Sequence, residues 1–339
     1  MKDVTEPSAT PDFLNHDRPP VPDLVVPRGV QPFHLANRPV RGRLVRLGPL
    51  AEALISRHAY APDVARLLGQ SLALTAGLAA ALKFRGSFSL QAKGDGPVGM
   101  LLADCTDTGS LRGYARISEG AEGMPRDIPR DIPRDIPRDI PRDIPTGEAA
   151  ALLGKGYLAF TCDQGQDMDR YQGIVAIEGD TLSAMTDRYF ETSEQLRAWV
   201  RLAAARTASG WRASALIMER VAGEGGIGAL DEEEQEEAWR TATILAGTLK
   251  DEELLDDSLP PERLLHRLFH EEDLVTDRAR SLSYGCRCSR ARLASVLQSF
   301  PGDDLDHMAE DGQIAMTCEF CNVEFRFDRA DVRSGAGRA

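Results

Sequence analysis

Residues 286–321 read CRCSRARLASVLQSFPGDDLDHMAEDGQIAMTCEFC and hold four of the six cysteines of this 339-residue chain. The four form a C-x-C pair and a C-x-x-C pair with 29 residues between the pairs: Cys286 with Cys288, and Cys318 with Cys321. A tetrahedral four-thiolate zinc site needs two close pairs at such a separation, since each pair supplies one edge of the tetrahedron. The stretch therefore predicts one Zn²⁺ per chain in a small C-terminal domain.

The C-x-C spacing also allows redox chemistry. Alternate residues of an extended strand lie about 6.6 Å apart, near the upper limit that a disulfide can bridge, so either pair can close locally if the backbone rearranges. A zinc-bound thiolate is already deprotonated and is a ready nucleophile toward an oxidant. Oxidation removes the ligands, and a module that depends on its metal then unfolds. The spacing alone leaves an inert structural zinc ribbon equally open.

The other cysteines and the histidines are weaker candidates. Cys105 and Cys162 stand alone in apolar, strand-like segments, and we interpret them as small buried side chains. His266 and His270 are four residues apart on an expected helix, and His307 lies within the cysteine module, but four clustered cysteines are the better ligand set. With no secretory signal visible, we expect a reducing, cytoplasmic compartment rather than a disulfide framework.

The charge of the chain excludes several classes of partner. The net charge is −13, and residues 231–280 hold 16 acidic and six basic residues. A protein that binds nucleic acid needs a basic face, and residues 281–339 also hold more acidic than basic residues, which argues against a nucleic-acid-binding zinc ribbon. No apolar run approaches the roughly 20 residues that span a bilayer, so we expect no membrane partner.

The rest of the chain predicts an α+β fold around a mixed-sheet core domain. Residues 1–37 are rich in proline and are expected to be a disordered tail, followed by the core domain over 38–230. Helices are predicted over 62–84 and 181–192, and strand-like or apolar segments over 86–94, 98–105, 110–118, 155–163, 171–180, 195–205 and 211–221. An acidic helical linker is expected over 231–280, a zinc-binding redox-switch domain over 281–332, and a short tail over 333–339.

Three further motifs are interpreted as having no function of their own. Residues 125–144 are five copies of Pro-Arg-Asp-Ile, expected to form a solvated loop because the prolines remove backbone donors. GEGGIG at 223–228 matches a dinucleotide fingerprint, but acidic residues follow where a pyrophosphate would sit. Gly154-Lys155-Gly156 lacks the spacing of a phosphate loop. The C-x-x-C pair lacks the strand–helix context of thioredoxin-like enzymes, so a thiol-disulfide oxidoreductase is an alternative without support from the fold.

Four segments make the chain resemble the 33 kDa chaperonin family of redox-regulated heat-shock holdases over about residues 38–332: CRCSRARLASVL, AEDGQIAMTCEFC, RYQGIVAIEGD and LLHRLFHEED. The resemblance implies that the four clustered cysteines bind zinc in a reduced, inactive form. It implies that oxidation forms the disulfides Cys286–Cys288 and Cys318–Cys321 and that the acidic linker then loses order. It also implies an ATP-independent chaperone rather than an enzyme, with unfolded or oxidatively damaged proteins as partners and a homodimer of the oxidised form. The N-terminal tail and the Pro-Arg-Asp-Ile array depart from the family's pattern without touching these motifs.

Overall fold

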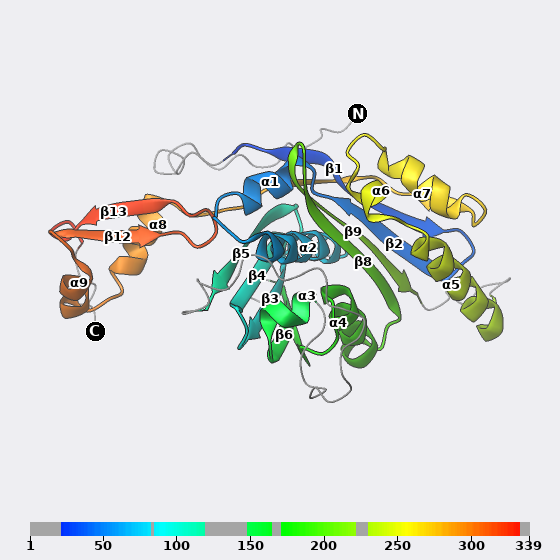
Figure 1. Ribbon diagram of the computed structural model, residues 1–339, viewed down its shortest axis with the longest axis horizontal. Coiled ribbons are helices and arrows are strands. Elements are labelled where there is room, and N and C mark those ends of the chain that lie inside the picture. Colours follow the sequence, from blue (N-terminus) through cyan, green and yellow to red (C-terminus); the bar gives the residue numbers. More distant parts are fainter. Residues whose placement is uncertain (1–21, 83–84, 119–147, 165–170, 222–229, 333–339) are drawn as a thin grey trace, which may run out of the picture. The chain divides into compact units, whose positions relative to one another are not determined.

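The computed structural model describes residues 22–82, 85–118, 148–164, 171–221 and 230–332. They fall into a larger compact unit, residues 24–285, and a smaller one that begins at Cys286. The expected α+β class is confirmed, with a large mixed sheet in the larger unit (Figure 1). The Pro-Arg-Asp-Ile array at 125–144 and the GEGGIG segment at 223–228 lie outside the described residues.

One sheet organises the larger unit, in the order β7-β6-β3-β4-β5-β11-β1-β2-β9-β8, with β10 also pairing with β1. The β5–β11 pairing is parallel and the others are antiparallel. The strands are β1 (Val25–Leu35), β2 (Val40–Arg46), β3 (Ser87–Gly94), β4 (Val98–Thr106), β5 (Ser110–Ile117), β6 (Gly156–Asp163), β7 (Tyr171–Ala176), β8 (Ala198–Thr207), β9 (Gly210–Arg220), β10 (Leu274–Thr276) and β11 (Arg280–Tyr284).

Helices α1 (Pro49–Ile55) and α2 (Pro62–Ala79) pack on one face of the sheet. Two glycines let α2 approach closely: a Cβ at Gly69 would lie 2.9 Å from the Cβ of Ala204, and one at Gly77 would lie 2.5 Å from the Cδ1 of Ile217. Helix α2 is buried almost all round, which explains its Ala- and Leu-rich sequence. Helices α3 (Glu148–Leu153) and α4 (Leu182–Tyr189) complete this layer, and α4 continues into a π-helical turn, Phe190–Glu194.

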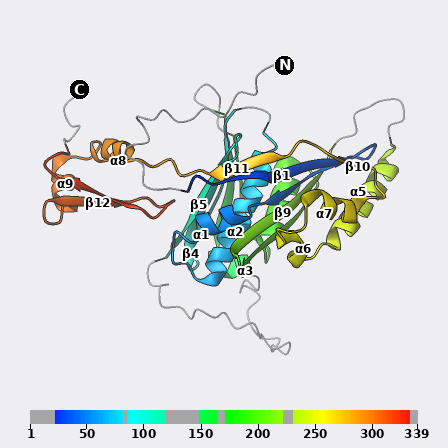
Figure 2. The same cartoon turned by 90° about the horizontal axis from the view of Figure 1, so that it is seen from above.

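Helices α5 (Glu232–Gly247), α6 (Asp251–Leu255) and α7 (Pro261–Phe269) cover β1, β2, β8 and β9 on the opposite face (Figure 2). We call these three helices, with the connections between them and the turn after α7, the acidic layer (residues 232–272). Leu44 packs under the acidic layer while its neighbour Val45 packs under α2, as side-chain alternation along a strand requires. The rings of Phe33 and Phe269 stack with centroids 5.5 Å apart at the centre of this second core.

Local sequence explains where the acidic layer begins. Asp231 caps α5: its side chain accepts from the backbone N–H of Glu234 at 2.9 Å, and the Glu234 carboxylate accepts from the N–H of Asp231 at 2.9 Å. This reciprocal capping, with acidic residues throughout the first turn, suits the positive end of the helix dipole. Pro261 at the first position of α7 has no N–H to leave unpaired there.

The expected disordered tail over 1–37 is wrong at its C-terminal end, since β1 pairs with β2, β10 and β11. Two prolines within β1 are the reason why the sequence did not predict this strand. Pro27 falls where the register with β11 shifts between Val26 and Val30, and Pro32 uses its carbonyl to accept from the N–H of Asp277 at 3.0 Å. A strand tolerates proline at such irregular positions, so the alternating burial of β1 survives.

Two other boundaries and one cysteine differ from expectation. Strand β11 lies in the main sheet, so the smaller unit begins at Cys286 rather than at residue 281. Helix α2 ends at Ala79, before the expected 84. Cys105 is buried as expected, but Cys162 is only half-buried near the edge of the sheet. Burial and Asp163 raise the pKa of the Cys162 thiol, which disfavours its reactive thiolate form.

Replacing Phe269 by alanine should detach the acidic layer selectively. The ring is fully buried, and truncating such a side chain costs about 3–5 kcal/mol of unfolding free energy. Urea denaturation with hydrogen exchange should show protection lost over 232–276 before β3–β6. The control is Ile244→Ala, because Ile244 is 64% exposed on α5; its effect should stay within about 0.5 kcal/mol. Equal effects of the two changes would contradict the described packing.

Asp187 of α4 gives the protein a pH dependence of stability. Its Oδ1 is buried without a hydrogen-bond partner among the described residues, and burial raises its pKa to about 7. An unfolded aspartate titrates near about 3.9, so between these pH values the folded state binds more protons, and the free energy of unfolding falls as pH rises. Asp187→Asn should stabilise the protein by about 1–3 kcal/mol at pH 8 and little at pH 4. Urea titrations at both pH values that gave equal shifts would contradict this assignment.

Candidate metal centre

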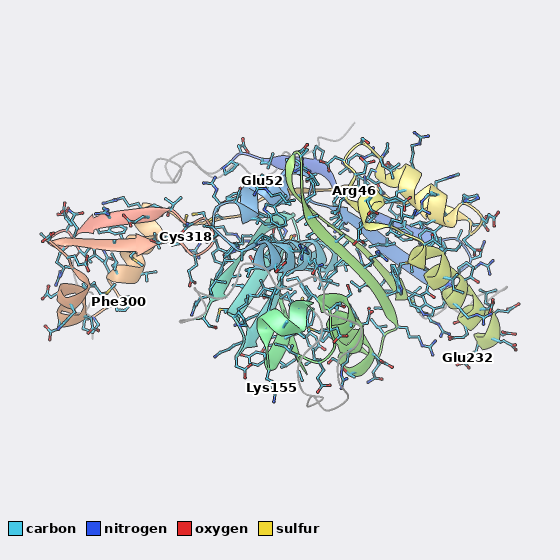
Figure 3. All side chains as sticks on the ribbon, viewed as in Figure 1. Arg46, Glu52, Lys155, Glu232, Phe300 and Cys318 are labelled. Carbon is cyan, nitrogen blue, oxygen red and sulfur yellow. The ribbon has the colours of Figure 1, made fainter. Side chains whose placement is uncertain are left out.

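The C-x-x-C pair lies in the turn of a hairpin formed by β12 (Gln313–Thr317) and β13 (Glu324–Asp328). The backbone N–H of Cys318 donates to the carbonyl of Val323 at 3.0 Å, and the N–H of Asn322 donates back to the carbonyl of Cys318 at 2.8 Å. Asn322 has φ 55°, a left-handed conformation that asparagine tolerates better than most residues. The turn therefore folds locally and brings the sulfur atoms of Cys318 and Cys321 close to each other. Figure 3 labels Cys318, at the start of this turn.

The C-x-C pair precedes α8 (Arg290–Leu297). Ser289, the next residue after Cys288, caps this helix by accepting from the backbone N–H of Arg292 at 3.2 Å. The pair is thus fixed in sequence at the positive end of a helix dipole, a setting that favours the thiolate form of cysteine. Helix α9 (Gly302–Met308) then leads to the hairpin.

The four sulfur atoms lie within 4.8 Å of one another. The Sγ atom of Cys286 is 3.4 Å from that of Cys288 and 3.7 Å from that of Cys318, and the Sγ atoms of Cys288 and Cys321 are 3.4 Å apart. A tetrahedral site with Zn–S bonds of about 2.3 Å has sulfur atoms about 3.8 Å apart. These distances fit such a site and far exceed the roughly 2.05 Å of a disulfide. Sulfur-only donors favour zinc or iron over harder cations.

The thiols of this quartet influence one another's ionisation. The hydrogen bond with Cys288 lowers the pKa of Cys286 to about 7, and the hydrogen bond with Cys286 lowers the pKa of Cys318. Hydrogen bonds with Cys286 raise the pKa of Cys288 and of Cys321. The ionisation of each thiol therefore depends on its neighbours, and a bound cation would favour the deprotonated form of all four.

The smaller unit has little else to hold it together. Its buried apolar side chains outside the cysteines are few: Leu297, Leu305, Ile314, Phe325, Phe327 and Val332. The guanidinium of Arg290 lies 4.6 Å from the centroid of the Phe327 ring, and the Nε of Arg329 donates to Asp306 at 2.7 Å. A unit of this size seldom folds without a metal, disulfides or a partner, so its stability depends on the cysteine quartet.

The structure does not bring the histidines into the cysteine quartet. The rings of His266 and His270 stack on α7 with centroids 5.4 Å apart, and the Nδ1 of His307 lies 2.6 Å from the carbonyl of Asp303. Over the described parts of the chain, the four cysteines are the group of His, Cys, Asp and Glu side chains placed to hold a metal. Lys155 donates its backbone N–H to Asp95 at 2.6 Å, so the Gly-Lys-Gly segment is part of a structural loop.

Sequence reasoning missed the arginines that face the acidic layer. Arg46 is the clearest case: it is 7% exposed and donates to the backbone carbonyls of Glu253 in α6 and of Asp256 just after it, and Figure 3 labels it near α6. The signal for such residues was the net charge of the 231–280 segment, which needs positive partners if the helices are to dock. Within the described ranges, no helix is long and apolar enough to cross a membrane.

Comparisons with known proteins agree with the architecture. The model of the Hsp33 protein family matches residues 29–328. The 33 kDa chaperonin of Caulobacter vibrioides strain NA1000 is 37% identical over 304 residues, covering 88% of this chain and 94% of the relative, and that of Pseudomonas fluorescens strain SBW25 is 34% identical over 314 residues, covering 91% and 94%. The crystal structure of the Thermotoga maritima 33 kDa chaperonin has a TM-score of 0.68 at 19% identity, with 90% of this chain and 96% of that chain covered, which shows a shared fold. The family match and these relatives show that the chain belongs to the Hsp33 family.

Proposed function

We propose that this protein is a redox-regulated, ATP-independent holdase that binds unfolding proteins after oxidation and is inactive when reduced and zinc-bound. The observation that carries the proposal is the cluster of four free cysteine sulfur atoms within 4.8 Å of one another. The chaperonin names of the relatives support the chaperone part of the proposal. A cytoplasmic location suits it, because a reducing compartment keeps the resting thiols reduced.

In the reduced form, the four cysteines would hold one Zn²⁺ per chain. The ion would supply the cross-link that the small unit otherwise lacks, and it would keep the four sulfur atoms deprotonated. Cys286 and Cys288 lie just before α8, and Cys318 and Cys321 lie in the β12–β13 turn. An ion bound by all four cysteines would therefore link two segments that lie far apart in the sequence of the small unit.

Oxidation would convert each pair to a disulfide. One peroxide molecule accepts two electrons from two thiolates as the sulfur–sulfur bond forms, takes up two protons from solvent, and leaves as two water molecules. We propose the pairs Cys286–Cys288 and Cys318–Cys321. The family resemblance supports this pairing. The distances leave it open, since Cys288 lies 3.4 Å from both Cys286 and Cys321.

Chain connectivity would carry the change to the acidic layer. Strand β11 ends at Tyr284, two residues before Cys286, and β10 and α7 lie directly upstream. Strand β11 pairs with β5 through only two residues, and its register with β1 is interrupted. We propose that loss of the metal loosens this strand and releases the acidic layer, whose net charge of −10 over 231–280 opposes a compact state once its contacts weaken.

Two alternatives have less support. An inert zinc ribbon accounts for the cysteine geometry but not for the similarity to proteins named chaperonins. A thiol-disulfide oxidoreductase needs a reactive cysteine at a helix start beside a substrate cleft, whereas the C-x-x-C pair lies in a hairpin turn.

The metal assignment predicts that Cys318→Ser will lower the metal content sharply, because three thiolates bind zinc much more weakly than four. The matched control is Cys105→Ser, which changes a buried cysteine of the sheet and should leave one metal ion per chain. Elemental analysis for zinc and iron of the reduced, purified proteins measures both. Stoichiometric zinc in a variant that lacks all four clustered cysteines would rule the site out.

The switch itself is tested by treating the zinc-loaded protein with peroxide at mildly raised temperature. We expect release of zinc, two disulfides per chain and suppression of the aggregation of an unfolding client. Hydrogen exchange should show protection lost over residues 232–332 and kept in β3–β6, because the metal-dependent module and the acidic layer are the least stable parts. A zinc-binding dye measures metal release, disulfide mapping identifies the cysteine pairs, and light scattering measures aggregation of the client. Zinc release without suppression would favour the inert ribbon, and suppression with unchanged protection would refute the proposed order-to-disorder step.

A further inference from the structure

The sheet face under the acidic layer is lined with arginines that pair with acidic side chains of the layer. These arginines lie in β1, in the β1–β2 turn, just before and within β8, and in β9. The ion pairs are Arg28–Glu262, Arg38–Glu272 at 3.6 Å, Arg197–Glu236 at 2.5 Å, Arg201–Asp251 at 2.8 Å, Arg212–Asp257 at 2.5 Å and Arg220–Glu236 at 2.7 Å. The layer is thus held by charge complementarity as well as by apolar contact.

These arginines differ in how much solvent reaches them. The side chains of Arg28 and Arg197 are 60% and 56% exposed, so their pairs contribute little to docking. The side chains of Arg212 and Arg220 are 10% and 18% exposed. Their partners Asp257 and Glu236 are 46% and 47% exposed, so these pairs are partly shielded from solvent and are screened less than those of Arg28 and Arg197.

Arg46 adds a positive charge that no carboxylate of the layer contacts directly. Its Nη1 donates to the carbonyls of Asp256 at 2.9 Å and of Leu259, and its Nη2 donates to the carbonyl of Glu253 at 2.8 Å. Its Nε is buried without a hydrogen-bond partner among the described residues, and burial lowers its pKa. The sheet face therefore holds a fixed cation that favours any segment bringing oxygen acceptors to this position.

Between the arginines, the same face of the sheet is apolar. The strand residues that contact the layer are Phe33, Leu35, Val40, Leu44, Ala203, Leu216 and Met218. A segment that replaces the layer must therefore supply apolar side chains on one side and acceptors toward the arginines around them. The acidic layer has this pattern: Trp239 and Phe269 are buried, while Glu236 and Asp257 pair with arginines.

We propose that this face, once vacated, selects unfolded client segments that are amphipathic and acidic. The inference rests on the proposed function, because the acidic layer has to leave before a client can bind. Carboxylates pair with the planar guanidinium groups that the layer releases. A basic segment of equal apolar content leaves those arginines unpaired and is repelled by them.

The test uses two labelled peptides and the oxidised full-length protein. One peptide has the sequence of residues 232–249, and the other replaces its five glutamates by lysine while keeping every apolar residue. At low ionic strength the acidic peptide should bind about tenfold more tightly, since a few partly exposed ion pairs together give this factor. The difference should shrink in 1 M NaCl, and the reduced, zinc-loaded protein should bind neither peptide well.

Variants of the arginines on the sheet face test whether they cause the preference for the acidic peptide. Arg197→Gln combined with Arg220→Gln, the two arginines that pair with Glu236, should reduce the affinity for the acidic peptide to about that for the lysine peptide. The matched control is Arg66→Gln on α2, which packs against the opposite face of the sheet and pairs with Asp63. Circular dichroism checks the fold of both variants. If the double variant does not fold, the salt dependence of the unaltered protein decides the question.

The outcomes separate the inference from the proposed function. Excess acidic peptide should abolish suppression of client aggregation, and the lysine peptide should not. Suppression with equal affinity for both peptides would overturn the inference and leave the holdase function intact. No suppression at all would overturn both. If sedimentation shows that the oxidised protein forms a dimer that excludes both peptides, a second copy occupies the face and the inference is wrong.

Discussion

Four cysteine sulfur atoms within 4.8 Å of one another would repel strongly if all were ionised, so they stay together only if protons or a cation neutralise their charge. In this chain that repulsion lies in a unit with a handful of buried apolar side chains and no large core to resist it. The fold of residues 286–332 is therefore conditional on what the sulfur atoms bind. A large hydrophobic core would remove this condition, and with it the response to oxidation that we propose.

The second conditional contact is the one between the acidic layer and the sheet. It combines a stacked Phe33–Phe269 core with ion pairs whose members range from nearly buried to more than half exposed. Exposed pairs contribute little each, but together they set which segment lies on the face and in which register. In the switch that we propose, the arginines that pair with the layer become unpaired when it leaves. Docking of the layer and recognition of a client would then depend on the same charges.

Sequence reasoning located the parts whose signal is local. The C-x-C and C-x-x-C pairs came from spacing, β3 to β7 from short apolar segments between turns, and α2 from its Ala- and Leu-rich run. It missed β1, because Pro27 and Pro32 mask an alternation that only pairing with three other strands reveals. It also missed Arg46, whose partners Glu253 and Asp256 lie some two hundred residues away. Contacts of that kind leave no mark on the local pattern.

The position of β11 in the sheet affects how the protein folds while it is being synthesised. This strand is the last of the larger unit to be synthesised, yet it lies between β5 and β1, near the middle of the strand order. Until residues 280–284 leave the ribosome, the β7–β5 and β1–β8 halves each present an open edge to the cell. A nascent chain that stalls before Arg280 therefore exposes two unpaired strands. Release factors or proteases that act on the stalled chain encounter an incomplete sheet. Until β11 joins the sheet, the newly made chain is itself exposed to aggregation.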